Sequence, residues 1–350
     1  MTRRARTVAA LCLAGALSAG CTLAGGGGQQ EQGPVTVTLA THDSWNAPQE
    51  VLTEFEQRSG IRIKILKEGD AGELTNKLVL AKDDPIADVA YGVDSTFASR
   101  ALAAGVFEPY TSPEADRGPQ RYAIDRQHRL SAVDVGDVCV NIDRQWFAER
   151  DLPEPETYAD LADPEYRGLL VVQNPATSSP GLAFLLGTIA RYGEEGWQDY
   201  WSRLRDNGVL TVSGWEEAYT QEFSGSSGEG PRPIVVSYAS SPANEIGEDG
   251  RPRTKALLET CYRQVEYAGV LAGGDQVDSA GKVVDFLLSQ EFQATVAEHM
   301  YVYPAREGVP LPAGWAEAAP LPEDPASLPS ERVEAEREHW VEQWRALLNQ

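Results

Sequence analysis

The chain has 350 residues, of which 42% are hydrophobic, and a net charge of −23 at pH 7. This length is enough for two domains. Nucleic-acid binding is disfavoured, because it depends on a basic surface. The charge would suit a cationic ligand, although acidity is also common in secreted proteins. The four histidines are scattered, and neither a His-Glu-x-x-His nor a Cys-x-x-Cys motif occurs, so we expect no metal site.

The N-terminus is typical of a secretory signal peptide. Three arginines within the first six residues precede apolar residues 8–17, a run too short to span a bilayer. The sequence LSAGC, residues 17–21, resembles a bacterial lipobox, so we expect Cys21 to be lipidated and to become the mature N-terminus. An ordinary signal peptide with an incidental cysteine is the alternative. Residues 1–20 are assigned to the signal, and the glycine-rich residues 21–34 to a flexible membrane tether.

Two cysteines remain once the signal and the anchor are set aside, Cys139 and Cys261. An exported protein folds in an oxidising compartment, where one remaining pair of cysteines forms a disulfide by default. The alternative is two buried free thiols.

Strand-like and helical runs alternate from residue 35 onward. The strand-like runs are 35–41, 61–69 and 87–94, and the helical runs that follow them are 48–56, 73–81 and 96–105. Such alternation predicts an α/β fold with a largely parallel sheet. Ligands of these sheets bind at the loops that follow the strands, which makes Asp70 and Asp94 candidate site residues. Simple capping of the following helices is the alternative.

The pattern starts again at residue 130. Further strands are expected at 130–142, as one long or bent strand, and at 168–175, 210–215, 233–242 and 264–271. Three connecting loops carry hydroxyl or aromatic residues where a strand ends and a helix begins: NPATSSPG (174–181), SGWEEAY (213–219) and SYASSPANE (237–245). Together they predict one shared site, with rings for an aromatic ligand and helix N-termini for an anionic group. Helix capping and ordinary core packing are the alternatives.

Five blocks of sequence resemble a known family. They are DPIADVAYGVDST (84–96), QNPATSSPGLAFLL (173–186), TVSGWEEAY (211–219), VVSYASSPA (235–243) and MYVYPAREGVPLPAGW (300–315). In this order they resemble the thiamine-binding branch of the extracytoplasmic solute-binding proteins of bacterial ABC importers. The resemblance covers roughly residues 35–350.

The resemblance implies a two-lobed α/β fold of the periplasmic-binding-protein type II class, with the ligand cleft between the lobes. Each lobe would be a mainly parallel sheet flanked by helices. Residues 35–138 together with 262–350 would form lobe 1, and residues 139–261 would form lobe 2. Cys139 and Cys261 would then lie where the chain crosses between the lobes, within reach of a disulfide.

Site residues carried over from the resemblance are Asp70, Ala71, Ser178, Ser179, Trp215, Tyr238, Ala239, Ser240 and Ser241, with His42 and Asp94 as additional candidates. Trp215 and Tyr238 would face the pyrimidine or the cationic thiazolium. Asp70 would accept a hydrogen bond from the aminopyrimidine, and the serines would bind the hydroxyethyl end or its phosphate esters. The chain has His42-Asp43-Ser44 where the family tends to have tyrosine-aspartate-serine, so a stacking contact there would fall to His42 or Trp45.

The implied function is capture of thiamine, thiamine monophosphate or thiamine diphosphate, and delivery to an ABC permease with its ATPase. The protein would act as a monomer without a cofactor, catalytic residue or metal, lipid-anchored at the outer face of the cell membrane. A polyamine or another small cation is the alternative ligand. Iron is disfavoured, because ferric binders of this superfamily use adjacent tyrosines and this chain has none. A secreted hydrolase is disfavoured, because no nucleophile, base and orienting group occur together.

Overall fold

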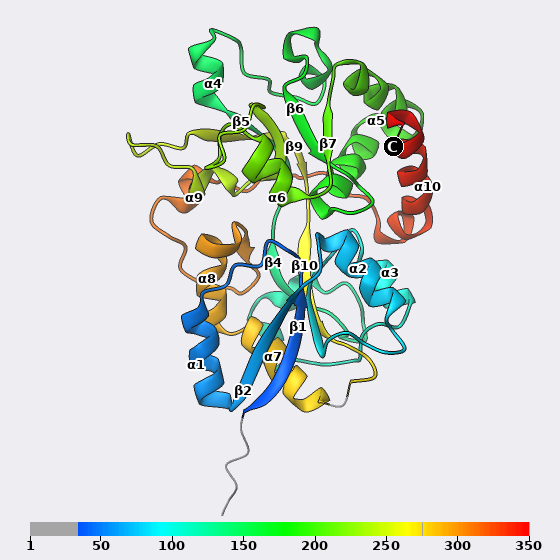
Figure 1. Cartoon of the computed structure of the whole chain (residues 1–350), viewed down its shortest axis with the longest axis vertical. Helices are drawn as coiled ribbons and strands as arrows, with labels where there is room; N and C mark the ends of the chain where they lie inside the picture. The colour runs from blue at the N-terminus through cyan, green and yellow to red at the C-terminus, as the bar shows by residue number, and fades with distance from the viewer. Residues whose placement is uncertain (1–33, 275, 350) are drawn as a thin grey trace, which may run out of the picture. The chain divides into compact units, whose positions relative to one another are not determined.

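Two β-sheets, each flanked by helices, organise the residues that the computed structural model describes, 34–274 and 276–349 (Figure 1). The predicted α/β fold class is therefore confirmed. The sheets are mixed rather than mainly parallel as expected, because the strands that follow each crossing pair antiparallel with their neighbours. The predicted signal peptide and Cys21 lie outside the described residues. In the part of the chain that the structure describes, no helix combines the length and the apolar character needed to cross a membrane.

The first sheet has the strand order β11-β4-β10-β3-β1-β2. Strand β1 is parallel to both β2 and β3, which matches the alternation in the sequence. Strand β10 runs antiparallel between β3 and β4, and β11 adds one further antiparallel pair. The strands are β1 (Val35–Thr41), β2 (Ile61–Lys67), β3 (Val89–Asp94), β4 (Ser131–Val135), β10 (Val265–Val270) and β11 (Tyr303–Pro304).

The second sheet has the order β7-β6-β8-β5-β9. Strand β6 is parallel to β7 and β8, whereas β5 is antiparallel to β8 and β9. The sequence pattern predicts no strand at the position of β9. The strands are β5 (Val138–Asp143), β6 (Leu170–Gln173), β7 (Leu210–Val212), β8 (Ile234–Tyr238) and β9 (Thr254–Tyr262).

The long strand expected at residues 130–142 is two strands in different sheets. The chain leaves the first sheet after Val135 and enters the second at Val138. Gly136 stands at this crossing, where a Cβ atom would come within 2.8 Å of the Tyr238 ring and 2.9 Å of Val302. A side chain at this position would therefore push the two halves apart.

Helices cover both sheets. They are α1 (Gln49–Ser59), α2 (Ala71–Leu80), α3 (Ala98–Ala103), α4 (Arg144–Glu149), α5 (Ser179–Asp206), α6 (Trp215–Glu217), α7 (Val277–Leu287), α8 (Gln290–Met300), α9 (Trp315–Ala318) and α10 (Ser330–Leu348). The apolar run that starts α5 is fully buried, as its helical spacing predicts.

Helix α10 contacts both halves of the molecule (Figure 1). On the side of the second sheet, Trp344 packs edge-on against Trp201 of α5, with 5.5 Å between ring centroids. On the side of the first sheet, the buried guanidinium of Arg337 donates to the Thr96 carbonyl at 3.3 Å. The C-terminal helix therefore holds α5 and the start of α3 in a fixed relation.

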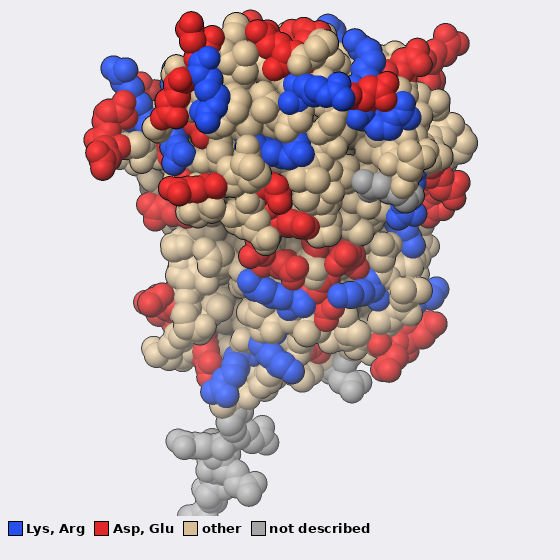
Figure 2. Space-filling model, turned by 45° about the horizontal axis from the view of Figure 1, so that its top comes forward, with Lys and Arg blue, Asp and Glu red and all other residues tan. Residues whose placement is uncertain are grey.

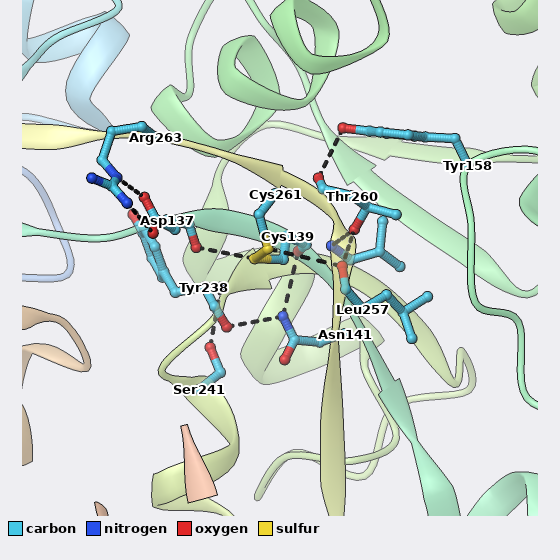
Figure 3. Close-up of a disulfide and its surroundings, with 11 residues drawn as sticks. Asp137, Cys139, Asn141, Tyr158, Tyr238, Ser241, Leu257, Thr260, Cys261 and Arg263 are labelled. Atoms are coloured by element: carbon cyan, nitrogen blue, oxygen red, sulfur yellow. Dashed lines mark hydrogen bonds and ion pairs between the residues drawn. A yellow bond between two sulfur atoms is a disulfide. The ribbon is translucent and has the colours of Figure 1, made fainter. Parts of the chain in front are cut away.

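The two crossings between the sheets lie side by side at a disulfide (Figure 3). Gly136 N donates to the Gln264 carbonyl at 3.1 Å, and the Arg263 guanidinium pairs with the buried Asp137 carboxylate. The disulfide joins Cys139 and Cys261, which are 122 residues apart in the sequence. It links β5 to the end of β9, directly before the chain returns to the first sheet through β10.

We expect loss of this disulfide to destabilise the fold. In the chain-entropy model a closed loop of this length is worth about 5 kcal/mol, and measured losses for native disulfides are about 2–5 kcal/mol. The double variant Cys139→Ala/Cys261→Ala should therefore unfold at lower denaturant concentration than the oxidised parent, with similar far-ultraviolet circular dichroism. Alkylation and mass spectrometry of the exported, unreduced parent provide the control. Two alkylatable thiols at these positions would contradict the disulfide.

Candidate functional site

A cavity of about 240 Å³ lies between the two sheets, and residues of both sheets line it. Its lining combines aromatic side chains with acidic and basic ones. The aromatic residues are Trp45, Trp215, Tyr219, Tyr238 and Tyr301, the acidic ones Asp43, Asp70, Glu216, Glu245 and Glu266, and the basic ones His42, Lys67 and His299. Such a lining suits a ligand that is both aromatic and cationic.

Trp215 is the centre of the aromatic wall. Its ring stacks on Tyr219 with 4.9 Å between centroids and 12° between planes. Tyr238 and Tyr301 lie at 6.2 Å and are tilted toward it. The indole Nε1 donates to Ser237 Oγ at 2.9 Å, which fixes the orientation of the ring. Tyr219 therefore covers one face of the indole, and Trp215 lines the cavity together with Tyr238 and Tyr301.

Asp70 connects the two halves at the edge of the cavity. It caps α2, where Oδ1 accepts from the Ala71 N–H at 2.6 Å. Oδ2 accepts from the Trp215 N–H at 2.8 Å, across 145 positions in sequence. Gly214 permits this approach, because a Cβ atom there would lie 3.0 Å from Asp70 Oδ2. Burial raises the pKa of Asp70, and the two backbone donors only partly offset this effect.

A chain of buried polar groups forms the floor of the cavity. His42 Nε2 lies 3.3 Å from Glu266 Oε2. The Tyr91 hydroxyl lies 2.8 Å from the same oxygen and 2.6 Å from Asp134 Oδ2. A hydroxyl has one proton and can donate to only one of two carboxylates, so the other carboxyl must be protonated to form a hydrogen bond.

The pKa directions identify the protonated carboxyl as Asp134. Burial and the nearby Glu266 charge raise the pKa of Asp134 well above its usual value. Burial would also raise the pKa of Glu266, but the charge and hydrogen bond of His42 outweigh it and the pKa is lowered. Burial likewise opposes the charged form of His42, yet Glu266 raises its pKa. The chain therefore runs from a protonated Asp134 through Tyr91 to a Glu266–His42 ion pair.

Six of the residues expected at the site line the cavity. They are His42, Asp70, Ala71, Ser179, Trp215 and Tyr238. Ser179 is 1% exposed, and its hydroxyl lies beside the Asp94 carboxyl and lowers the pKa of that group. It stands at the first position of α5 and lines the cavity.

The other five expected residues, Asp94, Ser178, Ala239, Ser240 and Ser241, are buried behind the cavity wall. Asp94 accepts from Thr96 Oγ1 at 2.9 Å, and burial raises its pKa to about 7. Ser241 Oγ lies 2.8 Å from Ser237 Oγ and so supports the group that orients Trp215. Direct contact of these five residues with a ligand stays a prediction.

Four further residues line the cavity that are not among those expected from the sequence: Tyr219, Glu245, Glu266 and Tyr301. Tyr219 stands four positions after Trp215, a spacing that places two side chains on one helical face and could have identified it. Its hydroxyl donates to Glu245 Oε1 at 3.0 Å, which brings that carboxylate to the cavity. Glu266 lies inside a strand, and nothing in its local sequence indicates that it meets His42.

The arrangement has no geometry for metal binding among the residues described. In that part of the chain, no group of three or more His, Cys, Asp or Glu side chains is placed to hold a metal ion.

Comparison with known proteins identifies the family of this chain. Residues 84–326 match the model of the family described as bacterial extracellular solute-binding protein. This chain is a member of that family. The matched range includes the second sheet and most of the residues around the cavity.

Individual relatives cover nearly the whole chain. A thiamine-binding periplasmic protein of Brucella suis is 29% identical, over 89% of this chain and 91% of its own. A thiamine-binding periplasmic protein of Escherichia coli K12 is 28% identical, over 89% and 93%. A solved periplasmic thiamin binding protein superposes with a TM-score of 0.80 at 26% identity, over 90% and 96%. Iron-bound HitA from Pseudomonas aeruginosa, at 20% identity and a TM-score of 0.70, shares the fold.

We expect substitution of His42 by glutamine to destabilise the protein in a pH-dependent way. The pKa of His42 is raised above 6.5, so its contribution is complete below that pH and is lost as the pH rises through the raised value. The pKa of Glu266 is lowered below 4.5, so its contribution is lost only as the pH falls through that lowered value. The stability difference between parent and variant should therefore be largest between pH 4.5 and 6.5.

Urea unfolding from about pH 5 to about pH 9 measures this difference in the free energy of unfolding. His339→Gln is the matched control, because His339 is exposed on α10. A difference that stays constant over this range would contradict the ion pair.

Proposed function

We propose that this protein captures thiamine outside the cytoplasm for an ABC importer. The observation that carries the proposal is the cavity, in which the Trp215 ring and several carboxylates line one space between two sheets. Thiamine combines an aminopyrimidine with a permanently cationic thiazolium, and both parts fit such a lining. The relatives named thiamine-binding, which match this chain over about nine-tenths of both lengths, support the same ligand.

The parts of the ligand have separate partners in this proposal. Trp215 and Tyr238 contact the rings, and Asp70 accepts from the amino group through a lone pair that Ala71 and Trp215 leave free. Ser179, which lines the cavity at the start of α5, receives the hydroxyethyl end. Phosphate esters at that end are included among the ligands, and the α5 N-terminus favours them.

Delivery to an ABC permease is part of the proposal, and the family membership and the N-terminal sequence support it. Solute-binding proteins of this kind pass their ligand to a permease that an ATPase drives. We propose that this protein acts as a monomer, anchored to the outer face of the cell membrane through lipidated Cys21. The two lobes are proposed as residues 35–138 with 262–350, and residues 139–261. No catalytic step is assigned, because the cavity residues serve binding.

We expect Trp215→Ala to weaken thiamine binding by about five- to thirtyfold, since loss of a desolvated ring contact costs on the order of 1–2 kcal/mol. Isothermal titration calorimetry with thiamine measures the effect, and spermidine serves as the competing cation. Trp146→Ala is the control, because Trp146 lies on α4 away from the cavity. Unchanged thiamine affinity in a folded Trp215→Ala protein would show that thiamine does not bind at Trp215.

We expect Cys21→Ser to release the protein from the membrane. The lipobox-like sequence LSAGC places the lipid on this cysteine, and without acyl chains nothing in the proposed topology holds the protein at the bilayer. Fractionation of cells that express the full chain measures the distribution between membrane and soluble material. Membrane retention equal to that of the parent would refute the anchor while leaving the ligand assignment intact.

A further inference from the structure

We infer that the Glu245 carboxylate is the counter-ion for a cationic ligand in the cavity, and that it makes the site prefer a cation over a neutral molecule of the same shape. This inference rests on the proposed function and names the residue that gives the site its charge selectivity. Glu245 ends the sequence block SYASSPANE, residues 237–245, and lines the cavity together with Trp215 and Tyr219.

Two of the carboxylates that line the cavity already have fixed partners. Glu266 is paired with His42, whose Nε2 lies 3.3 Å from Glu266 Oε2. The two oxygens of Asp70 accept from the backbone N–H groups of Ala71 and Trp215, at 2.6 and 2.8 Å. The protein itself therefore engages both carboxylates before a ligand enters.

Two further carboxylates of the cavity, those of Asp43 and Glu216, are exposed to solvent. Asp43 Oδ1 accepts from the Gly69 N–H at 3.0 Å. The ammonium group of Lys67 donates to the Asp43 carbonyl at 2.7 Å, which places a cation beside this residue. Water and salt screen exposed charges strongly, so these two groups attract a bound cation only weakly.

Glu245 differs from these four groups, because it is partly buried and forms no ion pair among the residues that the structure describes. Its Oε1 accepts from the Tyr219 hydroxyl at 3.0 Å. The charge of Arg253 reaches Glu245. The Arg253 guanidinium, however, lies 3.5 Å from Asp143 Oδ2 and donates to the Ser224 carbonyl at 2.9 Å. A partly desolvated carboxylate without its own cation is stabilised by a cation that the ligand brings.

The carboxylate of Glu245 acts on the aromatic wall of the cavity. Its hydrogen-bond partner Tyr219 stacks on Trp215, with 4.9 Å between ring centroids. Burial and the Glu245 charge raise the pKa of the Tyr301 hydroxyl, and the Tyr301 ring lies 6.2 Å from that of Trp215. A cation that packs against Trp215 therefore lies in the field of Glu245, so that ring and carboxylate attract it together.

The overall charge of the protein does not provide this selectivity. The net charge is −23, but acidic and basic side chains are interspersed on the face that Figure 2 shows, and salt screens exposed charges over about 8 Å. Discrimination between two ligands of one shape depends instead on a charge inside the cavity. A neutral ligand would cover Glu245 without pairing it, which costs free energy that a cation would recover.

Calorimetry of the full chain with thiamine and with deazathiamine tests the inference. In deazathiamine a neutral thiophene ring replaces the thiazolium, so the two ligands share a shape and differ in charge. We expect the parent protein to bind thiamine at least about tenfold more tightly than deazathiamine. Equal affinities of the parent for the two ligands would overturn the inference without the need for a variant.

The variant Glu245→Gln locates the effect, because it removes the charge but keeps the size of the side chain and an oxygen that can accept from Tyr219. We expect thiamine affinity to fall about tenfold and deazathiamine affinity to stay within about twofold. Glu245→Asp keeps the charge and should keep the preference for thiamine. Glu248→Gln is the matched control, because Glu248 is exposed and does not line the cavity, and it should leave both affinities unchanged.

An equal loss of affinity for both ligands in a folded Glu245→Gln protein would overturn the inference, because a residue that only shapes the cavity affects both ligands alike. An unchanged ratio of the two affinities would overturn it as well. The proposed function would stand in either case, since the parent still binds thiamine. Absence of thiamine binding by the parent would overturn the proposed function and this inference with it.

Discussion

The carboxylate of Asp70 is the contact on which the site depends. It begins α2 in the first half and accepts from the backbone of Trp215 in the second, at 2.6 and 2.8 Å. One partly buried carboxylate therefore contacts both the start of a helix and the backbone of the residue whose ring forms the aromatic wall. Hydrogen bonds to a charged group are stronger than those between neutral groups, and burial of either N–H without a partner would cost free energy. The bond to Trp215 joins the two halves at the cavity.

The floor of the cavity places several carboxyl groups in a buried region without leaving them unpaired. An isolated buried carboxylate is strongly destabilising, whereas a hydrogen-bonded series with one ion pair is tolerated. The Tyr91 hydroxyl lies within hydrogen-bond distance of both Asp134 and Glu266, and His42 pairs with Glu266. His42, which also lines the cavity, lowers the pKa of Glu266.

Much of the fold could be predicted from periodicity, because buried parallel strands and amphipathic helices leave strong local patterns. The strand at 35–41 and the apolar start of α5 are examples. Strand β9 was missed, since TKALLETCY mixes buried and exposed residues without regular alternation. The aromatic motifs and the family resemblance found Trp215 and Tyr238. Glu266 could not be found, because its role depends on a contact with His42 across 224 positions. Ser240 and Ser241 share a motif with Tyr238 but turn to structural partners, which sequence alone does not reveal.

The position of β10 has a consequence for the order in which the exported chain folds. This strand lies between β3 and β4 in the sheet. In the sequence, however, all the strands of the second sheet come between β4 and β10. The strands of the second sheet are contiguous from β5 to β9, so that half can close while β3 still has an unpaired edge. The first sheet cannot be completed until residues 265–270 are available, and until then β3 has an unpaired edge of the kind that can pair with other chains. The C-terminal helix α10, which contacts both halves, can dock only after that step.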